Sequence, residues 1–124
     1  MTPHSILLRQ VHPNFVFNGQ LTSQAFFPFP KDNGKLSVYD GDQISAKDAY
    51  LHYVKVLCHQ SCGVWGVEQL EVSEVGLISH ADALIDFPSH AVIDFANATE
   101  KECRKLAKKL RTLAAARGCL HCEP

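Results

Sequence analysis

Two histidines and one arginine are the residues of this sequence best suited to acid–base chemistry near neutral pH. They are His12, His90 and Arg9. A histidine exchanges its proton close to pH 7, and an arginine holds an anion through charge-assisted hydrogen bonds. Such a set would suit cleavage of RNA through its 2′-hydroxyl, so we take these three as the candidate catalytic residues.

Nearby hydroxyl groups complete a candidate anion-binding site, which we assign to Arg9, Ser23 and Ser37. Guanidinium and hydroxyl groups both donate hydrogen bonds to phosphate. None of the spacings is a recognised catalytic motif. Because polar residues at strand ends usually satisfy backbone groups of turns, we expect the cluster to be mainly structural. The remaining polar residues of the cluster are Thr22, Gln24, Lys31, Asp32, Lys35 and Asp40.

Two cysteine-containing segments carry the donor atoms that zinc prefers. Four of their six donors would have to meet in a tetrahedron to hold the ion, which requires the end of the first helix to reach the C-terminal segment. Structural zinc sites more often use a pair of C-x2-C motifs, so we predict no metal and no cofactor. The donors are Cys58, His59, Cys62, Cys119, His121 and Cys122, of which the four cysteines are the strongest metal candidates.

The number of cysteines and the absence of long apolar runs indicate a cytoplasmic protein. Five cysteines without a secretory signal favour reduced thiols over a disulfide framework. Redox chemistry at Cys119 and Cys122 is less favoured, because this pair does not begin a helix that would lower a thiol pKa. No segment approaches the roughly 18 apolar residues of a membrane span, so we expect no membrane partner.

Periodicity predicts strands and helices that alternate along one domain, residues 1–124. Proline, glycine and Asn-Gly pairs mark the boundaries, with a tight hairpin turn at Asn18-Gly19. Two prolines make residues 25–30 an edge or a loop. A helix begins after Ser45. The predicted strands cover residues 5–11, 35–39, 63–72 (continuing to 78 after a kink at Gly76) and 90–95, and the first helix covers residues 46–59.

The C-terminal helix has the clearest pattern. Thr99 and Glu102 form a capping box, and Gly118 is a suitable C-cap. The apolar side of the helix is formed by Cys103, Leu106, Ala107, Leu110, Leu113 and Ala114. The order of elements predicts an α+β fold, a mostly antiparallel sheet with two helices packed on one face.

Charge is segregated along the chain although the net charge is −1. No lysine or arginine occurs between residues 56 and 100. The outer side of the last helix is basic and could contact phosphates of a macromolecular partner, although a solvated surface is the simpler interpretation. Acidic strands and a basic helix in one molecule also predict a homodimer. The basic residues are Lys101, Arg104, Lys105, Lys108, Lys109 and Arg111.

Several segments, spread over most of the chain, resemble small bacterial proteins of unassigned activity that are carried on mobile or cassette-borne DNA. The resemblance implies a free-standing bacterial protein and assigns no role to any residue. The segments are residues 12–15 (HPNF), 22–26 (TSQAF), 31–32 (KD), 35–38 (KLSV) and 90–93 (HAVI).

Two functions from different classes follow from these patterns. The first is a noncatalytic binding or accessory protein that acts with a macromolecular partner or as a homo-oligomer. The alternative is a small enzyme acting on RNA or a nucleotide through His12, His90 and Arg9. A pocket that joins these residues would favour the enzyme, and a flat or apolar exposed face would favour the binding protein.

Overall fold

A twisted antiparallel sheet forms the centre of the molecule. The structure is a computed structural model that describes residues 1–29 and 33–123. In this part of the chain six strands pair in the order β6-β7-β4-β1-β5-β8, and every pair is antiparallel. The strands are β1 (Ile6–Val11), β4 (Lys35–Asp40), β5 (Gly63–Glu68), β6 (Ile78–Ala81), β7 (His90–Asp94) and β8 (His121–Cys122).

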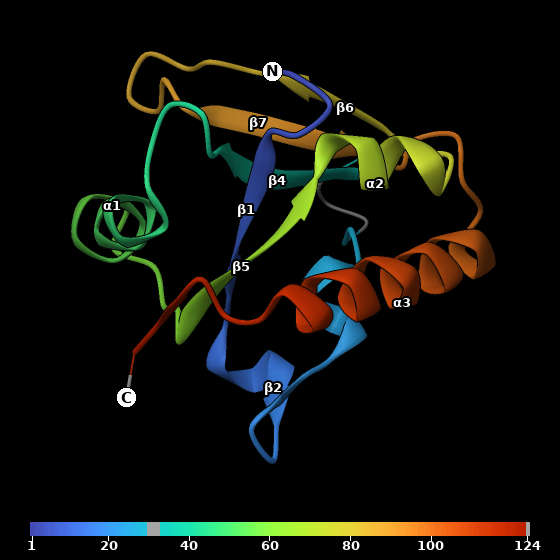
Figure 1. The fold of residues 1–124 in the computed structure, drawn as a ribbon, viewed down its shortest axis with the longest axis horizontal. Coiled ribbons are helices and arrows are strands. Elements are labelled where there is room, and N and C mark those ends of the chain that lie inside the picture. The colour runs from blue at the N-terminus through green and yellow to red at the C-terminus, as the bar shows by residue number, and fades with distance from the viewer. Residues whose placement is uncertain (30–32, 124) are drawn as a thin grey trace.

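The two halves of the sheet meet along a short seam. β1 pairs with β5 over six residues, and β4 pairs with β7 over five. In the described chain the register between β1 and β4 consists of two pairs, Leu7 with Asp40 and Leu8 with Tyr39. In Figure 1, β4 and β7 run across the picture, whereas β1 and β5 run between its top and its bottom.

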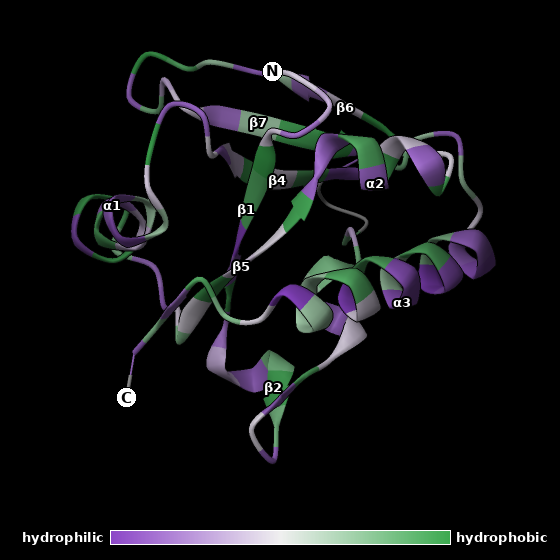
Figure 2. Cartoon of the chain, viewed as in Figure 1, coloured by the Kyte–Doolittle hydropathy of each residue, from purple (hydrophilic) through white to green (hydrophobic). Residues whose placement is uncertain are grey.

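α3 (Glu100–Arg117) covers one face of the sheet. Thr99 Oγ1 accepts a hydrogen bond from the Glu102 amide, and the Glu102 carboxylate accepts one from the Thr99 amide, so the predicted capping box is confirmed. Leu110 is fully buried in the main core cluster with Leu7 and Val67. Hydrophilic and hydrophobic bands alternate along α3, as expected for a helix with one buried side (Figure 2).

The other face is covered by α1 (Ala46–Leu51) and the π-helical turn η4 (His52–Val56). Ala49 of α1 packs with Leu8 and Val64 in a second core cluster. Figure 1 shows the sheet between α1 and α3. The predicted α+β class and antiparallel sheet are confirmed, but the prediction that both helices share one face is wrong. Neighbouring strand residues point to opposite faces, and both Leu7 and Leu8 are buried, so each face needs a cover.

Two predicted boundaries are corrected by local hydrogen bonding. The predicted strand over residues 63–72 ends at Glu68, and α2 (Gln69–Glu74) follows. A capping box explains this, because the Glu71 carboxylate accepts a hydrogen bond from the Glu68 amide at 2.8 Å. Arg117 of α3 then pairs with the carboxylates of Glu68 and Glu71, at 3.5 and 2.9 Å respectively. The first helical segment also ends early, at residue 56, before Cys58 takes a left-handed conformation (φ 59°).

The segment between β1 and β4 contains a hairpin and two short helical turns. β2 (Val16–Phe17) and β3 (Gln20–Leu21) flank the predicted turn, where Asn18 and Gly19 have φ values of 52° and 76°. The Asn-Gly turn is thus confirmed. The turn η2 (Ser23–Phe26) follows, with Phe26 fully buried. η1 (Pro13–Phe15) precedes β2 and is capped by His12.

Leu110→Ala should lower the free energy of unfolding by about 2–5 kcal/mol, because it leaves a cavity in the fully buried side of α3. Leu51→Ala is a matched control at a side chain that is 39% exposed and should cost much less. Urea unfolding followed by circular dichroism measures both. Equal stability of the Leu110 variant and the wild type would contradict the burial of this face.

Candidate functional site

A groove of about 550 Å³ opens on the seam between the two halves of the sheet. Because β1 and β4 pair only near Leu7 and Leu8, the strands leave room beyond that point. The wall opposite the strands comes from the π-helical turn and from the loop before β7. The lining residues are Arg9, Gln10, His12, Phe15, Phe29, Leu36, Ser37, Val38, Tyr39, Tyr53, Leu57, His59, Leu84, Phe87 and His90.

Arg9 bridges the strands where their pairing stops. Its Nε donates to the Ala25 carbonyl at 2.7 Å, and its Nη1 donates to the Ser37 carbonyl at 2.9 Å. Gln10 is buried, with 6% of its surface exposed, and lines the same groove. Its Nε2 has no hydrogen-bond partner among the described residues.

Ser37, His90 and Asp82 form a hydrogen-bonded line at the groove. His90 Nε2 lies 3.1 Å from Ser37 Oγ. On the other side of the ring, Nδ1 lies 3.0 Å from the Asp82 carbonyl oxygen and 3.2 Å from its carboxylate Oδ2. Both Asp82 oxygens are acceptors, so Nδ1 donates to them, and in the neutral imidazole Nε2 then accepts the Ser37 hydroxyl proton. A base that is oriented by a carboxylate and bonded to a hydroxyl is the arrangement of nucleophilic catalysis.

The sheet register explains how these three residues meet. Ser37 and His90 lie on neighbouring strands, two residues apart in register, because Ser37 pairs with Val92. Their side chains therefore share a face. Asp82 follows the last residue of β6, and its amide donates to the His90 carbonyl at 2.9 Å. His90 is 9% exposed, whereas the Asp82 side chain is 49% exposed.

An aromatic cluster supports the same side of the groove. The hydroxyl of Tyr39 lies 2.8 Å from His52 Nδ1, and His52 Nε2 lies 3.4 Å from the Asp86 carbonyl oxygen. The ring of Phe87 packs against Tyr39, His52 and His90, with centroids 4.5, 4.9 and 4.8 Å away. Burial, followed by the nearby Tyr53 phenol, raises the pKa of Tyr39 well above its usual value. Tyr39 thus stays a neutral hydrogen-bonding partner of His52. Its ring supports Phe87, which packs against His90.

The structure brings together four of the five candidate residues. Arg9, His12, Ser37 and His90 all line the groove, whereas Ser23 lies with Gln24 on η2, beside α3. His12 uses both ring nitrogens: Nδ1 accepts the Asn14 amide proton at 3.0 Å, and Nε2 lies 2.9 Å from Gln60 Oε1.

Asp40, Lys35 and Thr22 do not line the groove. Asp40 is buried and accepts hydrogen bonds from the Asp42 amide and the Gln43 side chain. Lys35 is exposed at the start of β4, and Thr22 donates to the Phe15 carbonyl. Lys31 and Asp32 lie outside the described residues.

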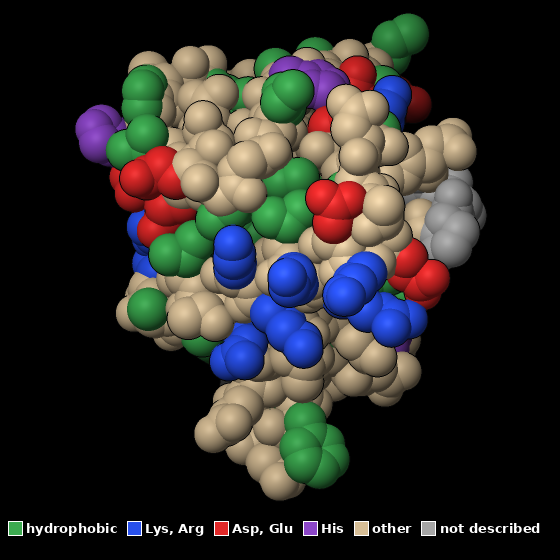
Figure 3. Space-filling view, turned by 90° about the vertical axis from the view of Figure 1, so that its right-hand side faces the viewer, with side chains coloured by type: hydrophobic (Ala, Val, Ile, Leu, Met, Phe, Trp, Pro, Cys, Tyr) green, Lys and Arg blue, Asp and Glu red, His purple; other side chains and the backbone are tan. Residues whose placement is uncertain are grey.

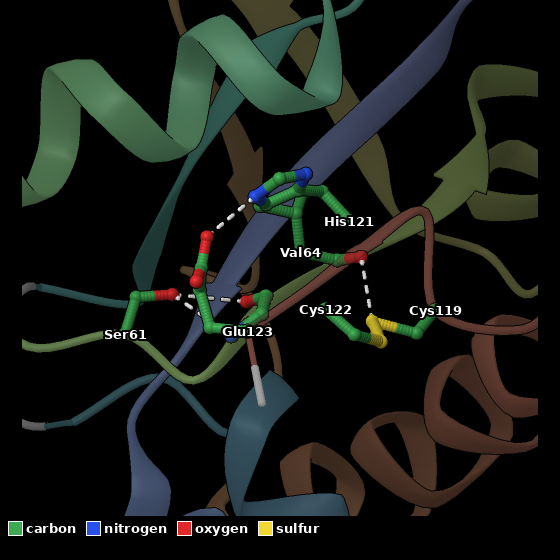
Figure 4. The surroundings of a disulfide bond; sticks show 7 residues. Ser61, Val64, Cys119, His121, Cys122 and Glu123 are labelled. Carbon is green, nitrogen blue, oxygen red and sulfur yellow. Dashed lines mark hydrogen bonds and ion pairs between the residues drawn. A yellow bond between two sulfur atoms is a disulfide. The ribbon is translucent and has the colours of Figure 1, made fainter.

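The C-terminal cysteines correct the prediction of reduced thiols throughout. Cys119 and Cys122 form a disulfide, shown in Figure 4. The two cysteines are three residues apart in the chain, and their Cα atoms lie 5.9 Å apart, within the range that a disulfide spans. β8, which contains Cys122, pairs with β5. Cys58, Cys62 and Cys103 are free thiols.

The C-terminal segment does reach the first helix, as a zinc site would require, but the contact is made by packed aromatic rings. Tyr50 and His121 pack with centroids 5.0 Å apart. His121 Nε2 pairs with the Glu123 carboxylate at 2.9 Å (Figure 4). Within residues 1–29 and 33–123, no three histidine, cysteine or acidic side chains are grouped as a metal site would need.

Sequence reasoning missed Asp82, Tyr39 and His52 as parts of the site. Asp82 joins His90 through the β6–β7 pairing, in which Ala81 lies opposite Ala91. No local sequence motif predicts that pairing, although residues 82 and 90 flank one loop. Tyr39 and His52 meet only because α1 and η4 lie on the groove side of the sheet.

No family model, curated protein or solved structure matches this chain. None of the helices in the described ranges has the length and apolar character needed to cross a bilayer.

The raised pKa of Tyr39 predicts a loss of stability at alkaline pH. The Tyr39 phenol ionises at about pH 10 in the unfolded chain, whereas in the folded protein it holds its proton to higher pH. The contribution of Tyr39 to folding stability is therefore complete below about pH 10 and is lost as the pH rises above it. Tyr39→Phe should remove this loss, and Tyr53→Phe should reduce it only in part, because burial is the larger cause of the raised Tyr39 pKa. Urea unfolding between about pH 8 and 11, with absorbance titration of the three tyrosines, tests this. Simultaneous ionisation of all three phenols would contradict it.

Proposed function

We propose that the protein is a small enzyme that cleaves phosphate esters of RNA or nucleotides in the groove. The observation that carries the proposal is the line from Asp82 through His90 to the Ser37 hydroxyl. His90 is the general base, Ser37 the nucleophile, and Asp82 the residue that orients the imidazole.

The proposed cleavage of the phosphate ester proceeds in two steps. Ser37 Oγ forms a bond to phosphorus while the bond from phosphorus to the leaving oxygen breaks, and the Ser37 proton passes to His90 Nε2. His90 then gives this proton to the leaving oxygen. In the second step His90 takes a proton from water, the resulting hydroxide displaces Ser37 Oγ from phosphorus, and the proton returns to Ser37.

The groove also supplies charge and apolar surface for a nucleotide. The Arg9 guanidinium is held beside Ser37 by its bond to the Ser37 carbonyl, where its positive charge would stabilise a phosphate. The rings of Phe15, Tyr53 and Phe29 line the same groove and offer faces for a base. His12 is committed to Asn14 and Gln60, so we assign it a positioning role and leave the base to His90.

A groove that joins Arg9, Ser37 and His90 is the feature that favours an enzyme over a noncatalytic binding protein. A binding protein would need no histidine held between a carboxylate and a hydroxyl. The basic outer side of α3 is the feature that favours a macromolecular partner, and it is compatible with an enzyme.

Ser37→Ala and His90→Gln should each lower turnover of a chromogenic nucleotide ester, thymidine 5′-(p-nitrophenyl phosphate), by about 100-fold or more. Asp82→Asn should cost less, because the Asp82 backbone carbonyl still accepts the Nδ1 proton. Ser23→Ala, outside the groove, is the matched control. Circular dichroism confirms that each variant folds.

Two outcomes would contradict the enzyme. One is wild-type protein with no turnover of this ester, of nucleotides or of RNA. The other is a folded Ser37→Ala variant with wild-type turnover, which would exclude Ser37 as the nucleophile.

We also propose a homodimer, on the charge segregation of the sequence and on apolar side chains at the surface. Phe17 and Ile85 are 70% and 100% exposed. Arg117 already pairs with Glu68 and Glu71 within one chain, so fewer charges are left for contacts between chains. Light scattering at micromolar concentration should give the mass of two chains, and a single-chain mass would refute the dimer.

A further inference from the structure

A second hollow, of about 330 Å³, lies between η2 and the first half of α3. It combines aromatic and basic side chains that are far apart in the sequence. Phe27 and Phe29 form one wall, and Arg104 and Lys108 form the other. The sequence shows no aromatic residue within the basic helix, so only the packing of η2 on α3 brings the two kinds together. The remaining lining residues are Ser23, Gln24 and Glu100.

Phe29 connects this hollow to the groove, because it lines both. Its ring stacks on Phe15, with centroids 6.1 Å apart and an angle of 28° between the planes. On the other side it meets the edge of Phe27 at 6.3 Å. Phe15, Phe29 and Phe27 thus form an aromatic ridge that runs from the groove with Ser37 to the basic side of α3.

The basic side of α3 is accessible to a polyanion. Figure 3 shows lysine and arginine side chains gathered over this helix. Arg104 and Lys108 are one turn apart, about 6 Å along the helix axis. Arg104 pairs with Glu100 at 2.8 Å, but both side chains are largely exposed, and such a surface pair is weak enough for a phosphate to compete with it.

We propose that the substrate of the groove is a single-stranded polynucleotide whose flanking nucleotides bind along the aromatic ridge and α3. Unpaired bases stack on Phe27 and Phe29, while Arg104 and Lys108 contact the phosphates. The phosphate to be cleaved then reaches Ser37. A base-paired duplex hides the faces that the rings would contact. This inference rests on the proposed function, since it names the substrate class of the same site.

Binding is tested in the Ser37→Ala background, which keeps the probe intact. A fluorescein-labelled ten-nucleotide RNA and the DNA of the same sequence distinguish the sugar, and a duplex of that sequence is the comparison. Arg104→Glu and Lys108→Glu should each weaken single-strand binding about tenfold or more at low salt, and Phe27→Ala should do so at any salt. Lys47→Glu on α1 is the matched charge control and should change affinity less than about twofold.

Turnover separates this inference from the proposed function. Lys108→Glu should raise KM for the labelled oligonucleotide about tenfold and leave turnover of the small chromogenic ester unchanged. Wild-type protein that turns over neither the ester, nor nucleotides, nor RNA would refute the enzyme and leave the binding result unaffected. Single-strand affinity that resists charge reversal on α3, an equal loss with Lys47→Glu, or tighter binding of the duplex would each overturn the inference.

Discussion

The short pairing between β1 and β4 is the constraint on which the site depends. Two residue pairs hold the halves of the sheet together near Leu7 and Leu8 in the described chain. Beyond them the strands part, and side chains replace the missing ladder. Arg9 donates to the Ser37 carbonyl, which satisfies an acceptor that a continuous sheet would have paired. The same gap gives the Ser37 hydroxyl an open groove on one side and His90 on the other.

The layers on both faces keep this gap from closing. α3 buries Leu110 and its neighbours on one face, and α1 buries Ala49 on the other, so the strands cannot shift toward either side without losing apolar contacts. The π-helical turn widens the end of the first helix and sets Tyr53 and Leu57 at the groove wall. Such turns occur often at functional sites, and here the turn lies across the groove from the strands that carry Ser37 and His90.

Local signals in the sequence predicted much of the fold. The Thr99–Glu102 capping box and the Asn18-Gly19 turn depend on residues close in the chain, and both have the predicted geometry. Which sheet face a helix covers depends on contacts between distant residues, and periodicity alone could not decide it. α2 was hidden because its N-cap, Glu68, is also the last residue of β5, so no turn residue separates the strand from the helix.

The candidate site was predictable only in part for the same reason. Polar type and strand position singled out Arg9, Ser37 and His90, whereas Asp82 needed the pairing of β6 with β7. Ser23 was misplaced because η2 turns its chain segment toward α3. The disulfide between Cys119 and Cys122 joins residues only three positions apart, and it was missed because an odd number of cysteines without a secretory signal favoured reduced thiols.

In the proposed mechanism His90 makes the Ser37 hydroxyl nucleophilic. Fluorophosphonates react covalently with serines that are activated in this way, and intact-mass analysis with peptide mapping locates the adduct. We expect one adduct per chain, on Ser37, that disappears in the His90→Gln variant. An unmodified wild-type protein, or an adduct on Ser37 that forms equally fast without His90, would contradict it.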